Sequence, residues 1–131
     1  MKRNYLSNFL PEKGYLYYFG KLPRKFIKPN ILHCNIDFSE DNIFSIWDGY
    51  FNSIYQNIFD KYSFGELPLE FKEYHTCRDF DTGIRINVIK TLCILEGIEN
   101  KKLDLDADEC LMDLIKFFKE NISKEIFIVE Y

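Results

Sequence analysis

Apolar residues recur with two different periods along this chain, and the change of period constrains the fold more than any other feature. Between residues 31 and 38 apolar and polar side chains alternate, as in a strand with one buried face. Between 111 and 122 apolar side chains recur at helical spacing. Because the two patterns occupy separate segments, the sequence predicts an α+β fold.

Three segments are predicted to form strands: 15–19, 31–38 and 125–130. The first is a run of apolar and aromatic residues between Gly14 and Gly20, and the last is a short apolar run. In the middle segment Leu32 and Ile36 would face one side, with Asp37 on the other. These strands are expected to form one small sheet.

A first long helix is predicted from about residue 40 to 61. Ser39 suits its N-cap, and a wide apolar stripe starts at Ile43. Gly49 within it indicates a bend or a close contact. Residues 63–80 are predicted to form a long irregular connection, and such connections often carry function.

Two more helices are predicted after this connection. The second would open at Asp81 or Thr82, bury most of its surface and end at Gly97. The third would begin at Asp106 as N-cap, with Glu109 completing a capping box. The expected architecture is therefore three helices packed on a sheet of about three strands, in a single domain spanning 1–131.

Charge is distributed unevenly along the chain. The whole sequence has a net charge of −4, yet residues 1–33 hold seven Lys/Arg against one acid, and residues 34–131 hold ten against twenty. Two oppositely charged regions favour steered association with a protein partner. The acidic total and the lack of a nucleic-acid motif argue against nucleic-acid binding.

The sequence predicts a cytoplasmic protein that does not enter a membrane. Its four cysteines contain no C-x-x-C pair, which favours free thiols in a reducing compartment. Residues 1–14 lack the apolar stretch of a signal peptide, and no apolar run approaches the roughly 18 residues of a membrane span.

One triplet, Asp81-Thr82-Gly83, matches the sequence around the catalytic carboxylate of aspartic proteases. That chemistry needs two carboxylates that share a proton, each on a turn between apolar strands. The chain contains the triplet once, with charged flanks and a predicted helix after it. A helix N-terminus explains the triplet better.

Metal-binding patterns are also incomplete. The acids from Asp104 to Glu109 lack the central glycine and the twelfth-position glutamate of an EF-hand loop, where Ile115 stands instead. His33 and Cys34 would point to opposite faces of a strand, and no His/Cys pair has zinc-finger spacing. We therefore expect no metal, no cofactor and no catalytic residue, and predict that the protein is not an enzyme.

Acidic and aromatic residues gather before the second predicted helix, and a second group of acids precedes the third. Such side chains can fill pockets of a basic partner and match its Lys and Arg residues. An alternative is that Arg78 and Arg85 pair with neighbouring acids and hold the connection in place. The predicted partner-binding residues are Glu70, Phe71, Glu73, Tyr74, Asp79, Phe80, Asp81, Asp104, Asp106 and Asp108.

Three stretches of the chain resemble small immunity proteins of bacterial toxin systems, including contact-dependent growth inhibition: WDGYFN (47–52), RDFDTG (78–83) and DADECLMDL (106–114). The resemblance implies a cytoplasmic protein that binds and neutralises a cognate protein toxin, with a basic nuclease as the expected class. The alternatives are an adaptor or mobile-element regulator that binds a host complex, and an unrecognised small enzyme.

Overall fold

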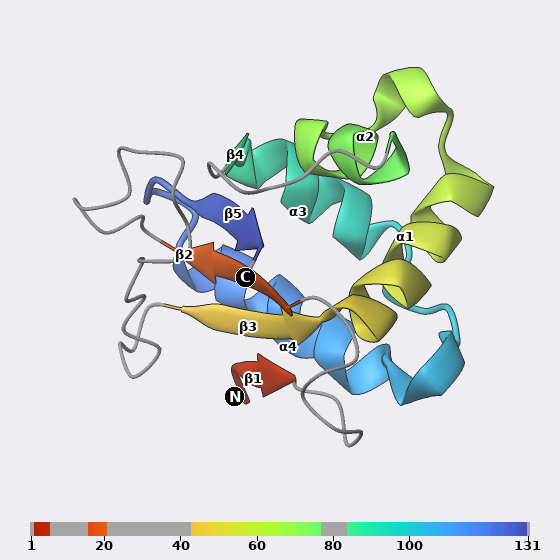
Figure 1. Ribbon diagram of the computed structural model, residues 1–131, viewed down its shortest axis with the longest axis horizontal. Coiled ribbons are helices and arrows are strands. Elements are labelled where there is room, and N and C mark those ends of the chain that lie inside the picture. The colour runs from red at the N-terminus through yellow and green to blue at the C-terminus, as the bar shows by residue number, and fades with distance from the viewer. Residues whose placement is uncertain (1, 6–15, 21–42, 77–83, 131) are drawn as a thin grey trace.

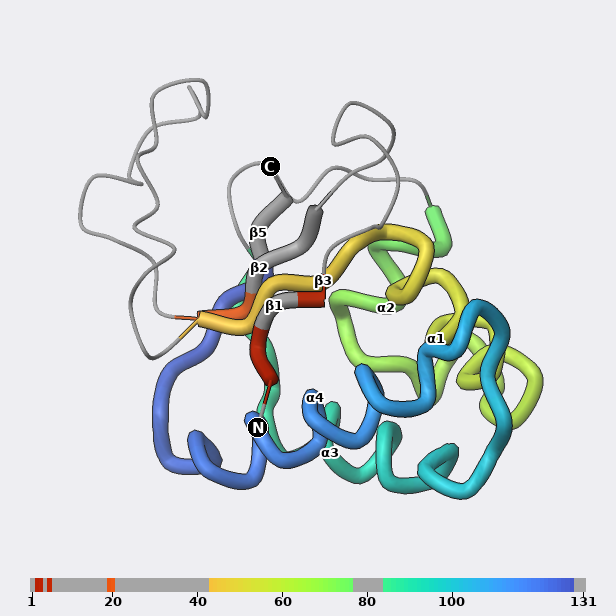
Figure 2. Tube along the Cα trace, turned by 90° about the horizontal axis from the view of Figure 1, so that it is seen from below, coloured from red at the N-terminus to blue at the C-terminus, as the bar shows by residue number. Residues whose placement is uncertain are grey.

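The computed structural model describes residues 2–5, 16–20, 43–76 and 84–130, and shows an α+β fold (Figure 1). The predicted class is confirmed, but the described part contains four α-helices and five strands rather than three of each. A single sheet lies over α4 (Asp108–Glu120) and α3 (Val88–Glu96), as the turned view shows (Figure 2).

The sheet has the strand order β1-β3-β2-β5-β4. The β1–β3 pair is parallel and the other three pairs are antiparallel. The strands are β1 (Asn4–Tyr5), β2 (Leu16–Gly20), β3 (Phe44–Trp47), β4 (Ile84–Arg85) and β5 (Phe127–Glu130).

Two of the predicted strands are confirmed. β2 and β5 lie within two residues of the predicted bounds 15–19 and 125–130, and they are neighbours, with Tyr18 opposite Val129. The third predicted strand, 31–38, lies outside the described residues, as does the proposed cap Ser39.

The start of the first helix is wrong in the prediction. Residues Phe44–Trp47 form a strand, and α1 runs over Asp48–Lys61, so only the C-terminal bound is confirmed. A short apolar run is compatible with a helix or a strand. Residues 44–47 form a strand because they pair with β1 on one side and β2 on the other. Gly49 then allows close packing, because a Cβ there would overlap the Trp47 ring.

The connection 63–80 is more regular than predicted where the structure describes it. Phe64–Glu66 form a 3-10 turn, η3, and Leu69–His75 form a helix, α2. A seven-residue helix is marginal alone, so its stability comes from tertiary packing of side chains such as Phe71.

The second predicted helix begins later than expected. The side chain of Asn87 caps α3 by accepting a hydrogen bond from the Lys90 N–H, and β4 occupies part of the predicted helical run. Asp81 and Thr82 lie outside the described residues. The end at Gly97 is confirmed.

The predicted capping box of the third helix is absent. Asp106 lies in the left-handed region at φ 56°, inside the 3-10 turn η4 (Asp104–Asp106), and α4 starts at Asp108. The carboxylate of Asp108 instead accepts a hydrogen bond from the Leu103 N–H at 2.7 Å. The predicted apolar stripe on α4 is buried, apart from Ile122 beyond the helix end.

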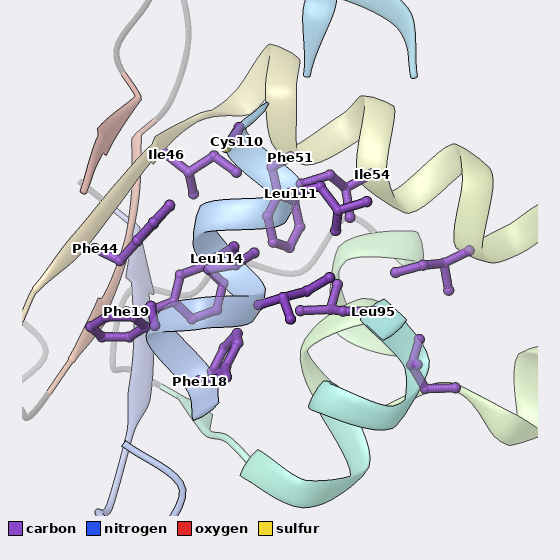
Figure 3. Packing of buried hydrophobic residues seen from close by; sticks show 14 of the residues in the cluster. Phe19, Phe44, Ile46, Phe51, Ile54, Leu95, Cys110, Leu111, Leu114 and Phe118 are labelled. Atoms are coloured by element: carbon purple, nitrogen blue, oxygen red, sulfur yellow. The ribbon is translucent and has the colours of Figure 1, made fainter. Parts of the chain in front are cut away.

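The core fills the space between the sheet and the helices (Figure 3). Phe19 of β2 meets Phe118 of α4 with ring centroids 5.4 Å apart, and Phe51 and Leu95 close the core from α1 and α3. Helix α4 therefore connects the sheet to α3, while α1 contacts the sheet directly.

None of the helices in the described residues is long and apolar enough to cross a membrane. Cys93 and Cys110 are free thiols. The other two cysteines, Cys34 and Cys77, lie outside the described residues.

Candidate protein-binding surface

Three aromatic rings from three elements meet at the surface where α1, η3 and α2 come together. We call Phe59, Phe64 and His75 the aromatic patch. The ring of His75 stacks on Phe59, with centroids 4.9 Å apart, and lies 5.3 Å from Phe64. Phe59 and Phe64 are 41% and 44% exposed, so both rings face solvent although they contact a neighbour.

A continuous series of ring contacts connects this patch to the core. Buried Phe71 stacks on Phe51 at 5.4 Å, and Phe51 contacts Tyr74 at 4.9 Å. Tyr74 contacts Tyr55 at 5.0 Å, and Tyr55 contacts Phe59 at 5.7 Å. The exposed rings thus rest on packed rings rather than on loose side chains.

Hydrogen bonds fix the polar ends of these rings. The Tyr55 hydroxyl is hydrogen-bonded to Nδ1 of His75. The Tyr74 hydroxyl lies 3.2 Å from a carboxylate oxygen of Asp48 and 3.0 Å from the side-chain oxygen of Asn52. Because both contacts join α2 to α1, they hold the two helices in one arrangement.

The short turn η3 presents Phe64 and is closed by its own capping contacts. The Glu66 carboxylate accepts hydrogen bonds from the backbone N–H and the hydroxyl of Ser63, at 3.0 and 2.8 Å. These bonds lower the pKa of the Glu66 carboxyl, the backbone bond contributing most. Glu66 is therefore a fixed negative charge two positions from an exposed ring.

Charges of both signs surround the patch. Asp60 follows Phe59 in the sequence and Glu66 follows Phe64 by two positions, and both are exposed; the Lys72 ammonium lies 5.9 Å from the centroid of the Phe64 ring. Exposed rings flanked by charges are the chemistry of an interface anchor, since aromatic side chains supply much of the binding energy at protein interfaces.

Two of the predicted partner-binding residues face inward, which corrects the expectation of an outward-facing connection. Glu70 is 0% and Phe71 1% exposed. Residues 69–75 form a helix rather than a loop, and the face of α2 that includes Glu70 and Phe71 packs on the core. Neither side chain can contact a partner in this structure.

Glu70 is a buried acid with limited hydrogen bonding. The Thr91 hydroxyl donates to Oε1, while Oε2 has no hydrogen-bond partner. Burial raises the pKa of the Glu70 carboxyl to about 7, against the opposing effect of the Thr91 hydrogen bond. A carboxyl with this pKa changes protonation state near neutral pH.

The other residues predicted to bind a partner between positions 73 and 81 differ in where they lie. Glu73 and Tyr74 are half-buried on α2, and Tyr74 belongs to the ring series described above. Asp79, Phe80 and Asp81 lie outside the described residues, as does Arg78. Arg85 pairs with Glu125, with Nε and Oε1 3.4 Å apart.

The second predicted group of acids forms an exposed turn before α4. Asp104 and Asp106 are exposed, and Asp108 is half-buried. The Ser53 hydroxyl of α1 donates to the Asp104 carbonyl at 3.0 Å. Ser53 and the patch residue Phe59 are about 120° apart around a helix, so the Asp104 turn and the aromatic patch lie on different sides of α1.

The members of the aromatic patch are not among the predicted partner-binding residues, and His75 drew attention only as a rejected metal ligand. Phe59 falls in the helical apolar stripe and was expected to face the core, while Phe64 and His75 stand in what was predicted to be an irregular connection. No local pattern marks them, because the patch exists only once α2 has folded back on α1.

Within the described residues, no group of three or more His, Cys, Asp or Glu side chains is placed to hold a metal ion.

Comparison with known proteins finds no matching family model, curated protein or solved structure.

Proposed function

We propose that this protein is an inhibitor of the immunity type, which neutralises a cognate protein toxin by tight one-to-one binding. The observation that carries the proposal is the aromatic patch, in which Phe59 and Phe64 are exposed and yet held by packed rings. The resemblance of three sequence stretches to immunity proteins of bacterial toxin systems supports the same function.

The energetics of association favour such a patch. Binding costs conformational entropy for every side chain that it orders, and rings already held in place lose less of it. Aromatic anchors therefore contribute more net affinity here than on a mobile loop. Two phenylalanines from different elements would form the centre of the contact.

The charge of the molecule fits a basic partner. The net charge is −4, and the Glu66 carboxylate, held by Ser63, lies two positions along the chain from Phe64. A basic toxin, with a nuclease as the proposed class, would be attracted at long range and anchored at short range. Asp104 and Asp106 add negative charge on another side of α1.

The proposal is tested by growth protection. A toxin candidate encoded next to this protein is expressed from an inducible promoter, together with the native chain, Phe59→Ser or Phe64→Ser. We expect the native chain to restore growth, and each variant to bind the purified toxin at least about tenfold more weakly in a calorimetric titration, the loss typical of an interface anchor.

Met112→Ser is the matched control, because Met112 is also about half exposed, at 50%, but lies on α4. Thermal melting checks that all variants fold. Equal toxin affinity of the three variants would exclude the aromatic patch as the contact. No protection by the native chain would overturn the immunity function, and co-purification with a subunit of a host complex would favour an adaptor.

A further inference from the structure

A groove of about 590 Å³ lies where β4 passes into α3, opposite the segment that connects α4 to β5. It is open to solvent and shares no residue with the aromatic patch. Arg85, Asn87 and Ile89 line one side, and Ile122, Lys124 and Glu125 line the other. A concave site of this volume lies within the range of ligand-binding pockets.

The backbone on both sides of the groove is held in place. Strand β4 lies beside β5 (Figure 1). Their pairing continues one residue further, through a hydrogen bond of 2.8 Å from the Ile86 N–H to the Ile126 carbonyl. Asn87 caps α3 with its side chain. The Ile86–Ile126 bond therefore joins the segment before α3 to the segment before β5.

The groove is locally positive on an acidic protein. Arg85 and Lys124 contribute two cations against one carboxylate, that of Glu125, which already lies 3.4 Å from Arg85. Val88 and Ile89 also line the groove. An anionic group in the groove would thus meet the two cationic side chains.

Apolar side chains complete the lining. Ile89 is 62% and Ile122 49% exposed, and they come from the two opposite sides of the groove. Exposed isoleucines beside a cationic centre match a ligand that carries an acid between apolar groups. A free inorganic anion would leave both isoleucines uncovered.

We propose that this groove binds an extended segment of a partner protein in which one carboxylate lies between two bulky apolar side chains. Arg85 and Lys124 would hold the carboxylate, and Ile89 and Ile122 would cover the apolar side chains. This site is separate from the aromatic patch, so either site can fail its test without affecting the other.

The test is an NMR titration of the full-length, 15N-labelled protein with the peptide acetyl-Gly-Leu-Glu-Leu-Gly-amide. We expect saturable shifts of the amide signals of Asn87, Ile89 and Lys124. The same peptide with Gln in place of Glu should bind at least about two- to fivefold more weakly, because an exposed ion pair contributes about that much to affinity.

Two variants locate the contact. Lys124→Gln should weaken binding of the Glu peptide about two- to fivefold and leave the Gln peptide unaffected. Lys116→Gln is the matched control, because Lys116 is exposed on α4 but does not line the groove. Ile89→Ser should weaken both peptides.

Each contrary result overturns the proposal. Equal affinity for the Glu and Gln peptides would show that the groove does not recognise the carboxylate. Shifts that map away from the groove, or no saturation at millimolar peptide, would exclude this groove as the site. Amide spectra of each variant without peptide confirm that the fold is retained.

Discussion

At the scale of single residues, Glu70 is the side chain whose environment departs most from its ordinary chemistry. It lies in the core between α2 and α3, with one hydrogen bond from the Thr91 hydroxyl. A buried carboxyl is stable when protonated and costly when ionised. Its titration is therefore coupled to the stability of the fold.

This coupling predicts a pH-dependent stability. Folding raises the pKa of Glu70 from 4.5 to about 7. The protonated carboxyl therefore contributes its full share to the free energy of unfolding below pH 4.5, and this share is lost as the pH rises through 7. The loss is on the order of 3 kcal/mol. Urea unfolding of the native chain and Glu70→Gln between pH 4.5 and 8 should show a flatter profile for the variant.

Glu120→Gln serves as the control for this series, because Glu120 is exposed at the end of α4. Its profile should follow that of the native chain. A Glu70→Gln profile as steep as the native one would show that another group causes the pH dependence.

At the scale of elements, the strand β3 and the helix α1 follow one another without a connecting loop. Strand β3 ends at Trp47 and helix α1 begins at the next residue, Asp48. The apolar run from Ile43 was predicted to be entirely helical, because its side chains fit a helical stripe. Pairing with β1 and β2 makes its first part a strand, and a single-sequence pattern contains no information about those partners.

Gly49 makes this transition possible, and it provides an element-scale prediction. Alanine normally stabilises a helix by about 1 kcal/mol relative to glycine. At position 49 the added Cβ would overlap the Trp47 ring, so we expect Gly49→Ala to destabilise the protein. Thermal or urea unfolding measures the sign of the change.

Gly65→Ala is the matched comparison, since a Cβ at position 65 would meet open space. We expect it to be neutral or to stabilise the protein by up to about 1 kcal/mol. A stabilising Gly49→Ala would mean that the Trp47 ring moves aside without cost, and that the glycine is not required for the transition.

At the scale of the whole molecule, α4 joins the sheet to α3. Its buried face contacts β2 through the ring of Phe118 and also packs on α3 (Figure 3). The same helix is linked to the N-terminal strand, because the Tyr5 hydroxyl donates to the carboxylate of Asp113. Loss of packing on α4 therefore affects every layer.

Phe118→Ala should consequently destabilise the protein by about 3–5 kcal/mol, the usual cost of emptying a fully buried ring site. Ile122→Ala, beyond the end of the same helix and half exposed, should cost less than about 1 kcal/mol. Urea unfolding measures both. Similar losses for the two variants would contradict the central role of α4.

The sequence by itself determined the fold class, the strands β2 and β5 and the buried stripe of α4. Each of these depends on a periodic pattern within one segment, and such a pattern identifies both the element and its inward face. The end of α1 at residue 61 was predicted where its apolar stripe stops, and the end of α3 at Gly97 was predicted because glycine commonly ends helices.

Only the tertiary structure decided the strand β3, the helix α2 and the surface that carries the candidate site. Glu70 and Phe71 turn inward because α2 packs on the core, while Phe59 stays at the surface although it follows the apolar stripe of α1. Which members of an apolar pattern are covered depends on the elements that arrive from elsewhere in the chain, and local spacing does not specify these.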